Sequence, residues 1–274
     1  MRSAVTVSLV EEARGGPFVL WDGLEAGCRT ARQLGYDAVE IFTPAPDAID
    51  PHVLRRLLDE HRLQLAAVGT GAGWVKHKLT LALPDAARRR QAVDFIKAII
   101  DFAGPFGAPA IIGSMQGRSG DGVDRATARG YLAESLEWLG EHARQYGVPL
   151  LYEPLNRYET DQVNRVEDGV ALLSSLSTRN VRLLCDLFHM NIEETDVAEA
   201  LKAAGELVGH IHFVDSNRRP VGLGHMDLRP IIAALRSIGY AGFLSVEAFP
   251  YPDSLAAAQQ TIRAYRYYVG EQAS

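Results

Sequence analysis

The chain has 274 residues, of which 47% are hydrophobic and 23% are charged, an ordinary globular composition that argues against disorder. Its length suits one large domain or two small ones, and a chain of this size buries about three quarters of its unfolded surface without help from disulfides. With 28 Lys and Arg against 34 Asp and Glu, its net charge of −6 argues against nucleic acid and anionic membranes as partners, because both require a positive surface.

The N-terminal segment and the cysteines indicate the compartment. The first residues, MRSAVTVSLVEEARGG, contain a short apolar run that Glu11 and Glu12 interrupt, so we expect neither a signal peptide nor a membrane span. Cys28 and Cys185 lie far apart and form no CxxC pattern, which is typical of free, buried thiols in a reducing compartment. The sequence therefore predicts a cytoplasmic protein.

Short apolar runs rich in strand-forming residues recur along the chain. Each run is almost wholly apolar, which indicates burial on both faces, as in a parallel sheet covered by helices. The eight predicted strands are, in order, Ala4–Val10, Asp37–Phe42, Gln64–Gly69, Ala108–Ser114, Val148–Glu153, Val181–Asp186, Val208–Val214 and Gly242–Glu247.

Amphipathic stretches alternate with these runs. The first, Trp21–Gly35, places Leu24, Cys28 and Ala31 on one helical face and ends at Gly35, a residue that stops helices. The other predicted helices are Asp85–Gly107, Arg125–Gly147, Val166–Ser177, Asp196–Gly205, Asp227–Gly239 and Ser254–Gly270. This alternation and this length predict one α/β domain over residues 1–274, a (β/α)₈ TIM barrel, with a doubly wound open sheet as the alternative.

Four consecutive predicted strands carry ionisable residues near their carboxyl ends. The fifth strand ends in Glu153, the sixth in Asp186 and the eighth in Glu247, while the seventh contains His210 and His212. Because the active site of such a barrel lies at the carboxyl ends of its strands, we expect these side chains to surround one point.

This set of residues predicts a metal site. Three carboxylates in one partly buried cleft repel one another unless protons or a cation neutralise them. His212 is nearer the strand end than His210, so it is the expected ligand, while His210 is expected to be a satisfied core histidine. The predicted ligands are Glu153, Asp186, His212 and Glu247. Oxygen ligands with one imidazole favour Mn²⁺, which we expect first, or Mg²⁺ or Co²⁺.

Four strings surround these residues: EPLNRYETD (Glu153–Asp161), CDLFHMNIEE (Cys185–Glu194), GHIHFVDSNR (Gly209–Arg218) and SVEAFP (Ser245–Pro250). Together they resemble the xylose isomerase-like TIM barrels, and within them the sugar epimerases of the D-tagatose and D-psicose (allulose) 3-epimerase type and the related 5-keto-L-gluconate epimerases. The resemblance extends over the whole chain. It departs from the family in the loops after strands one to three, which hold the distal end of the sugar.

The resemblance implies a role for each matching residue. Glu153, Asp186, His212 and Glu247 match the metal ligands of the family. Of these, Glu153 and Glu247 also match its two acid–base residues. The positions that match its substrate contacts are Glu159, His189 and Arg218. The alternatives for these three are a rim salt bridge, a loop histidine bonded to backbone and a solvated surface charge. The family further implies a homodimer or a homotetramer.

The implied reaction inverts the carbon next to the ketone of a keto-sugar or keto-sugar acid through a cis-enediolate. A divalent ion stabilises that species, and two carboxylates on opposite faces remove and return the proton. The alternatives are an aldose–ketose isomerase that shifts hydrogen between C1 and C2 of a related sugar or a hydroxypyruvate-like substrate, and a non-catalytic sugar-binding module. An AP endonuclease-like nuclease is disfavoured by the acidic charge.

The loops give weaker indications of the substrate. The loop after strand eight, AFPYPDS, has no glycine, which favours an unphosphorylated sugar, although the loop after strand seven has two glycines and two arginines. Three aromatic residues in predicted loops could pack on a sugar ring, with ordinary loop packing as the favoured interpretation: Trp74, Phe249 and Tyr251. The exact sugar and the glutamate that acts as base in each direction stay open.

Overall fold

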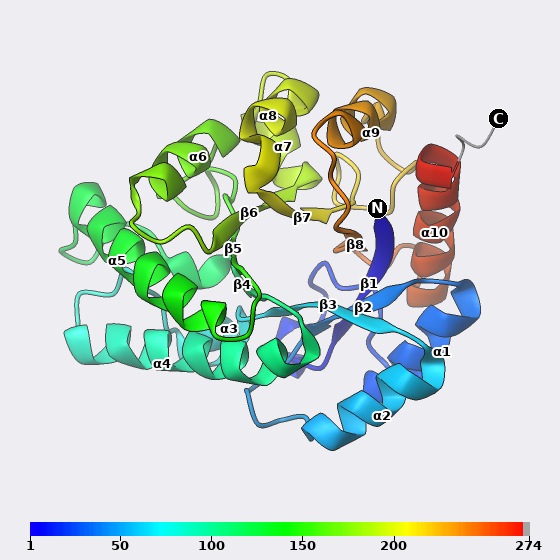
Figure 1. Cartoon of the computed structure of the whole chain (residues 1–274), viewed down its shortest axis with the longest axis horizontal. Helices are drawn as coiled ribbons and strands as arrows, with labels where there is room; N and C mark the ends of the chain where they lie inside the picture. The colour runs from blue at the N-terminus through cyan, green and yellow to red at the C-terminus, as the bar shows by residue number, and fades with distance from the viewer. Residues whose placement is uncertain (271–274) are drawn as a thin grey trace.

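Eight parallel strands form a closed barrel in this computed structural model, which describes residues 1–270 (Figure 1). Each strand pairs with the next one in the chain, and the eighth pairs with the first. The strands are β1 (Arg2–Ser8), β2 (Ala38–Phe42), β3 (Gln64–Gly69), β4 (Ala110–Ile112), β5 (Leu150–Tyr152), β6 (Val181–Asp186), β7 (Val208–His212) and β8 (Phe243–Val246). The predicted (β/α)₈ barrel is confirmed, and the open sheet is wrong. The last four residues of the predicted domain lie outside the described residues.

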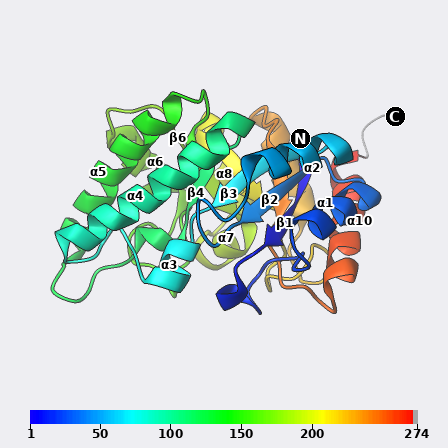
Figure 2. The same cartoon turned by 90° about the horizontal axis from the view of Figure 1, so that it is seen from below.

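Helices surround the barrel (Figures 1 and 2). The α-helices are α1 (Leu24–Leu34), α2 (Pro51–His61), α3 (Ala72–His77), α4 (Ala86–Ala103), α5 (Arg125–Arg144), α6 (Val166–Ser175), α7 (Leu187–Glu193), α8 (Val197–Ala204), α9 (Leu228–Ser237) and α10 (Ser254–Gly270). The 3₁₀ helices are η1 (Glu11–Ala13), η2 (Gly104–Phe106), η3 (Ser114–Gln116) and η4 (Gly205–Leu207). Within residues 1–270, no helix combines the length and the apolar character needed to cross a membrane.

Local sequence signals explain where these helices begin and end. An aspartate precedes several of them and accepts backbone N–H groups of the first turn, as Asp85 does for α4 and Asp124 does for α5. Gly35 ends α1 in the left-handed conformation, at φ 84°, as its position in the sequence predicts. These caps fix the helix boundaries and therefore the positions of the loops that follow each strand.

The predicted elements omit α2, α3 and α7. Helix α2 has ordinary signals, since Asp50 caps it, Pro51 opens it, and its leucines face the core. Helix α7 is short and follows β6 directly, because the Asp186 side chain accepts the N–H groups of Phe188 and His189. His189, expected in a loop, therefore lies in the first turn of a helix.

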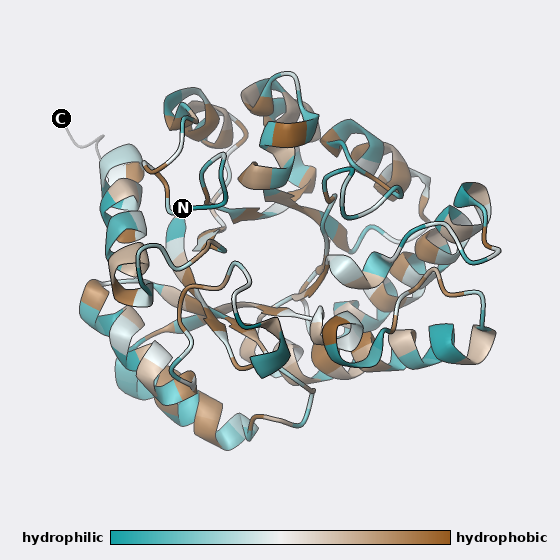
Figure 3. Cartoon of the chain, turned by 180° about the vertical axis from the view of Figure 1, so that it is seen from behind, coloured by the Kyte–Doolittle hydropathy of each residue, from teal (hydrophilic) through white to brown (hydrophobic). Residues whose placement is uncertain are grey.

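The core has one large layer between strands and helices and a smaller layer formed by alternate strand residues. Figure 3 shows mainly hydrophobic residues along the barrel strands, and both hydrophobic and hydrophilic residues on the helices around them. The smaller layer contains Ala67, Ile111, Leu151 and Leu184. Ala67 is in register with Glu40 of β2, and Leu184 is in register with His210 of β7. Polar side chains from β2 and β7 therefore lie at the same level of the barrel as these apolar residues. Among the described residues both cysteines are free and buried, as predicted.

Candidate active site

The four residues predicted as metal ligands lie together at the carboxyl ends of β5–β8. The Nδ1 atom of His212 is 3.2 Å from Asp186 Oδ2, 3.6 Å from Glu153 Oε1 and 3.6 Å from Glu247 Oε2. One donor atom from each of the four residues lies within 4.8 Å of the others. Glu153 and Glu247 directly follow β5 and β8, while Asp186 and His212 are paired at the ends of β6 and β7. The register of the strands therefore brings these residues together, and their role as ligands stays a prediction.

The two carboxylate oxygens of Asp186 have different partners, one in the backbone of α7 and one in the cluster. Its Oδ1 accepts the backbone N–H groups of Phe188 at 2.7 Å and of His189 at 3.3 Å, at the start of α7. Its Oδ2 faces His212. Burial works against the charge on Asp186, but His189, His212 and Arg218 hold its pKa well below the usual range. Asp186 is thus a fixed, ionised carboxylate with one oxygen turned towards the site.

Glu153 presents an oxygen without a partner. Its Oε1 is buried and accepts no hydrogen bond within the described part of the chain. The carboxylate lies against the backbone of Gly113, where a Cβ atom would be 2.5 Å from Glu153 Oε2, so any larger residue would displace it. Burial raises the pKa of Glu153 to about 8, with Glu247 and Asp186 adding to the shift and His212 opposing it.

The pKa values of Glu247 and His212, the other two residues of the cluster, are also shifted by burial and by the neighbouring charges. Burial raises the pKa of Glu247, against the opposing effects of His212 and Arg218. Burial alone would lower the pKa of His212, but the surrounding carboxylates, Glu247 and Glu40 first, raise it well above its ordinary value. The negative charge thus exceeds what the nearby side chains can neutralise.

This donor set fits a divalent cation. Three carboxylates and one imidazole nitrogen converge, and the buried oxygen of Glu153 lacks a proton donor among the described residues. Leaving a buried carboxylate oxygen unpaired costs free energy, which a cation bound among these atoms would recover. Predominantly oxygen ligands are those that Mn²⁺ and Mg²⁺ prefer.

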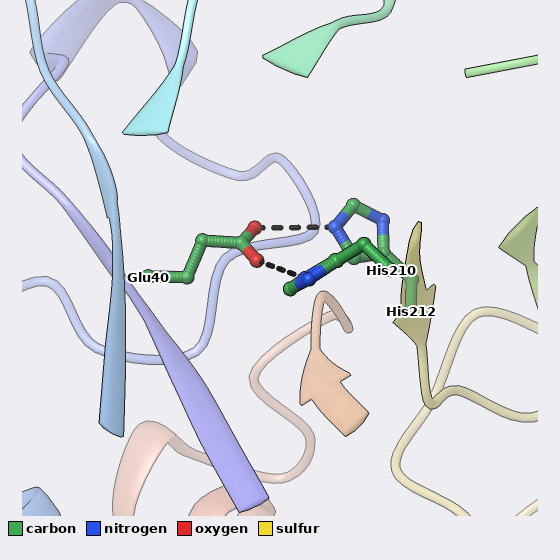
Figure 4. Close-up of side chains that lie close together, drawn as sticks. All are labelled: Glu40, His210 and His212. Carbon is green, nitrogen blue, oxygen red and sulfur yellow. Dashed lines mark hydrogen bonds and ion pairs between the residues drawn. The ribbon is translucent and has the colours of Figure 1, made fainter. Parts of the chain in front are cut away.

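Sequence reasoning missed Glu40, which lies on the other side of His212 (Figure 4). Glu40 Oε2 is 2.7 Å from His210 Nε2, and Glu40 Oε1 is 3.1 Å from His212 Nε2. Burial opposes the charge on Glu40, but the two histidines outweigh it and hold the pKa of this carboxyl well below its usual range. Because Glu40 accepts a hydrogen bond from Nε2 of His212, Nδ1 is the atom turned towards the cluster of carboxylates.

The three predicted substrate contacts also lie beside the cluster. Asn156 donates to His189 Nδ1 from its side chain at 2.7 Å, so the proton of this imidazole is placed on Nε2. That Nε2 is buried, has no hydrogen-bond partner in residues 1–270 and lies 3.8 Å from Glu153 Oε1. The N–H group therefore faces the space among the carboxylates. His189 belongs to α7 and not to a loop, but its Nδ1 also accepts the backbone N–H of Asn156 at 3.3 Å, so the backbone bond that the alternative expected is present.

Arg218 and Glu159 form a pair at the rim of the cluster. Arg218 Nη2 donates to Glu247 Oε2 at 2.7 Å, and its Nη1 is 3.5 Å from Glu159 Oε1. The backbone of Arg218 has φ 59°, a conformation that is uncommon outside glycine. Arg218 is therefore a mostly buried side chain held against the site, and it is not the solvated surface charge that was its alternative.

A cavity of about 370 Å³ lies over these residues, within the range of small-molecule sites. Its ionisable side includes Glu153, His189, His212, Arg218 and Glu247. Its lining also includes Phe18, Phe42 and Trp74, and the rings of Phe18 and Phe42 are stacked with their centres 4.4 Å apart. Among the residues the structure describes, Phe249 and Tyr251 do not line this cavity. This mixed lining suits a ligand that has both polar oxygens and an apolar surface.

The chain is similar to several known proteins. The family model described as "Xylose isomerase-like TIM barrel" matches residues 28–268. An L-ribulose 3-epimerase of Methylomonas sp. (strain DH-1) is 30% identical over 244 residues, which are 86% of this chain and 84% of that protein. A 3-dehydro-D-guloside 4-epimerase of Escherichia coli (strain K12) is 33% identical over 136 residues, 47% of this chain and 52% of that protein.

The fold is also similar to that of solved structures. A D-psicose 3-epimerase crystallised in the presence of D-fructose superimposes with a TM-score of 0.82 at 23% identity, over 98% of this chain and 100% of that one. At this level of identity the likeness shows the fold.

Proposed function

This chain belongs to the family of xylose isomerase-like TIM barrels, and we propose that it inverts the carbon next to the ketone of a keto-sugar with the help of a divalent metal ion. Its relatives are named as epimerases of sugars, so the chain is an enzyme of the carbohydrate epimerase class, as the resemblance implied. The reaction, the ligands and the metal are the proposal. One observation carries it: Glu153, Asp186, His212 and Glu247 converge on one point with a buried carboxylate oxygen left unpaired among the described residues.

The metal ion would be held by these four side chains and would act as a Lewis acid that stabilises negative charge on the ketone oxygen. The protein supplies the proton transfers. Glu153 and Glu247 follow β5 and β8, and each has an oxygen 3.6 Å from His212 Nδ1. One carboxylate removes the proton from the carbon beside the ketone, and the other returns a proton to the opposite face. The two steps together invert that carbon.

The surrounding residues hold the sugar and the carboxylates in place. The unpaired N–H group at His189 Nε2 supports a role as a donor to a sugar oxygen. Arg218 fixes the Glu247 carboxylate through its 2.7 Å hydrogen bond and offers further donors to the substrate. Glu159, held at 3.0 Å by the Asn156 amide, is placed to accept a hydrogen bond from a sugar hydroxyl. Phe18 and Trp74 add apolar surface to the lining of the cavity.

Hydrogen exchange in D₂O tests this reaction. The purified protein, loaded with Mn²⁺, is incubated with L-ribulose, D-psicose and D-fructose, and the sugars are analysed by NMR. The proposal expects deuterium at C3, in both the substrate and its C3 epimer. Deuterium at C1 or C2 alone would contradict it and would support the aldose–ketose isomerase. No exchange with any keto-sugar or keto-sugar acid would support a binding module.

Two finer expectations accompany the proposal. The oxygen-rich ligand set supports Mn²⁺ as the bound metal, with Mg²⁺ or Co²⁺ as alternatives, and activity of the metal-free protein reloaded with each ion checks this order. The homodimer or homotetramer rests on the family resemblance and stays a prediction, which size-exclusion chromatography with light scattering checks.

A further inference from the structure

Asn156 is a buried amide that contacts two of the predicted substrate contacts at once. It lies in the loop after β5 and is 2% exposed. Its Nδ2 atom is 2.7 Å from Nδ1 of His189 and 3.0 Å from Oε1 of Glu159. His189 belongs to α7, which follows β6, and Glu159 belongs to the same loop as Asn156. One amide group therefore links two functional side chains from different parts of the barrel.

The backbone fixes the orientation of the Asn156 amide. Its Oδ1 accepts the backbone N–H group of Tyr158 at 3.0 Å, as in the local turns that asparagine commonly forms. A backbone N–H group can only donate, so the oxygen of the amide must occupy this position. The NH₂ group is therefore the end that faces His189 and Glu159, and the carboxylate oxygen of Glu159 is a matching acceptor.

The same turn sets the position of Glu159. The backbone carbonyl of Asn156 accepts the N–H group of Glu159 at 3.0 Å, while the amide of Asn156 donates to its Oε1. Asn156 thus holds both the backbone and the carboxylate of this residue. Arg218 Nη1 lies 3.5 Å from the same Oε1. Within residues 1–270 both donors reach Oε1, which leaves Oε2 as the acceptor for a sugar hydroxyl.

The amide also determines which nitrogen of His189 carries the proton. The NH₂ group of Asn156, at 2.7 Å, and its backbone N–H group, at 3.3 Å, both donate to Nδ1. Two donors at one nitrogen require a lone pair there, so the proton of the neutral ring is on Nε2. Nε2 is buried and has no hydrogen-bond partner in the described part of the chain. Its N–H group is thus kept for a substrate oxygen.

We propose that Asn156 is a positioning residue for the reaction: it makes His189 a hydrogen-bond donor and Glu159 a hydrogen-bond acceptor towards the substrate. This inference rests on the proposed function and adds a residue that acts through its two neighbours. A sugar hydroxyl can donate and accept, so a fixed donor beside a fixed acceptor holds it in one orientation. Without the amide, only the longer backbone contact would hold this tautomer of His189, and Glu159 would lose its nearest donor.

Two substitutions of Asn156 separate this role from a purely structural one. Asn156→Asp keeps the shape and the oxygen that accepts the Tyr158 N–H group, but a carboxylate oxygen replaces the NH₂ group. An imidazole is a stronger base than a carboxylate, so Nδ1 of His189 then takes a proton, and Glu159 meets a like charge. Asn156→Ala loses the side-chain turn contact, but its backbone N–H group still donates to Nδ1. A positioning role therefore predicts the greater loss in Asn156→Asp, and a structural role in Asn156→Ala.

NMR reads the tautomer of His189 directly. Protein labelled with ¹⁵N is loaded with Mg²⁺, which is diamagnetic, and its histidine rings are observed through ¹H–¹⁵N correlations. The His189 signals are assigned by their absence from His189→Gln. We expect Nδ1 without a proton and Nε2 with one in the wild type and in Asn156→Ala, and a protonated Nδ1 in Asn156→Asp. A protonated Nδ1 in the wild type would overturn the inference.

The rate of deuterium exchange gives the second measurement, with the ketose that the wild type exchanges fastest among L-ribulose, D-psicose and D-fructose. Its kcat/KM should fall about a hundredfold in Asn156→Asp and about tenfold in Asn156→Ala. The loss in Asn156→Ala should lie mainly in KM, because a loosely held Glu159 weakens binding.

Matched substitutions of Asn180 are the controls. The Asn180 amide also donates to two acceptors, the carbonyl oxygens of Gly140 and Val148 at 2.9 Å each, but it precedes β6 at the other end of the barrel. Asn180→Asp and Asn180→Ala therefore make the same chemical changes away from the site. Their kcat/KM should stay within about twofold of the wild-type value.

Two further outcomes would overturn this inference and leave the proposed function standing. One is a loss in Asn156→Ala that equals or exceeds the loss in Asn156→Asp. The other is exchange within about twofold of the wild type in both variants. If Asn156→Asp does not fold, the wild-type spectrum and the activity of Asn156→Ala decide. Absence of exchange with every keto-sugar in the wild type would instead overturn the proposed function, while the spectra would still test the tautomer.

Discussion

Two groups of ionisable residues share His212, and they differ in how their charges are balanced. On the Nε2 side, both oxygens of Glu40 have an imidazole partner, and the pKa of Glu40 is low. On the Nδ1 side, three carboxylates surround one nitrogen, and Glu153 keeps an unpaired oxygen among the described residues and a pKa of about 8. Both groups have the residue types of a metal site.

The difference shows that residue type alone does not identify a metal site. The Glu40 group already has a hydrogen-bond donor for each carboxylate oxygen, so a cation there would displace existing bonds. The carboxylate cluster has more acceptors than donors, so a cation there would supply what is missing. We therefore propose that the ion binds in the cluster of Glu153, Asp186 and Glu247. The role we propose for Glu40 is to orient His212. The following predictions can break or sharpen this assignment.

The largest effect is expected from Glu247→Gln. It keeps the shape of the side chain and its hydrogen bond to Arg218 but removes the group that exchanges a proton. Loss of a general acid–base residue lowers turnover by about 10²–10⁴-fold. Deuterium exchange of the substrate measures this loss, and Glu11→Gln, at an exposed glutamate paired with Arg14, is the control. Full turnover in Glu247→Gln would show that the cluster has no catalytic role.

A smaller effect is expected from Glu40→Gln. The amide cannot hold the same tautomer of His212 as firmly, so the apparent affinity for Mn²⁺ should fall by about 10–100-fold. Calorimetric titration of the metal-free protein measures it, and saturating Mn²⁺ should restore most of the activity. If Glu40→Gln instead removed one of two bound ions, the Glu40 group would itself be a metal site.

The pH dependence of metal binding follows from the same comparison. In the metal-free chain the pKa values of Glu153, about 8, and of His212 are raised, so both residues carry protons at neutral pH. A metal ion binds their deprotonated forms. Apparent affinity should therefore rise with pH, by about tenfold per unit for each proton displaced, and the part of this rise that is due to Glu153 should level off above pH 8. Titrations between pH 6 and pH 9 check this, and an affinity that is flat over that range would contradict it.

The smallest effect is expected from a substitution in the Glu40 group, whose carboxylate oxygens both have imidazole partners. His210→Leu leaves Glu40 Oε2 buried without its 2.7 Å partner, which should lower the free energy of unfolding by about 1–3 kcal/mol. Urea denaturation measures this, with His52→Leu at an exposed position as the control. Stability equal to that of the wild type would mean that Glu40 is satisfied without His210.

The sequence predicts the barrel and the cluster because both depend on short-range patterns. Each strand is a visible apolar run, and each candidate ligand lies at the end of one, so the barrel topology alone places them together. Glu40 could not be recognised in this way. It lies in the middle of a strand, and its partner His210 is 170 residues away, so only the closed barrel shows that they meet. The polar residue inside the run AVEIF is the one signal that could have drawn attention to it.

The role proposed for Asn156 was also outside the reach of the sequence. An asparagine in a turn after a strand is ordinary loop composition. Its contact with His189 joins residues 33 positions apart and depends on how α7 packs beside the loop after β5, which no periodicity encodes. Glu159, His189 and Arg218 were found through the family resemblance, and the structure places all three beside the carboxylates.

Counting the ions bound per chain tests the central assignment most directly. Metal-free protein is titrated with Mn²⁺ while the EPR signal of the free ion is recorded, for the wild type, Asp186→Asn and Glu40→Gln. We predict one ion per chain in the wild type, none at comparable concentrations in Asp186→Asn, and one weakly held ion in Glu40→Gln. An undiminished ion in Asp186→Asn, or full epimerisation by protein that binds no ion, would contradict the account.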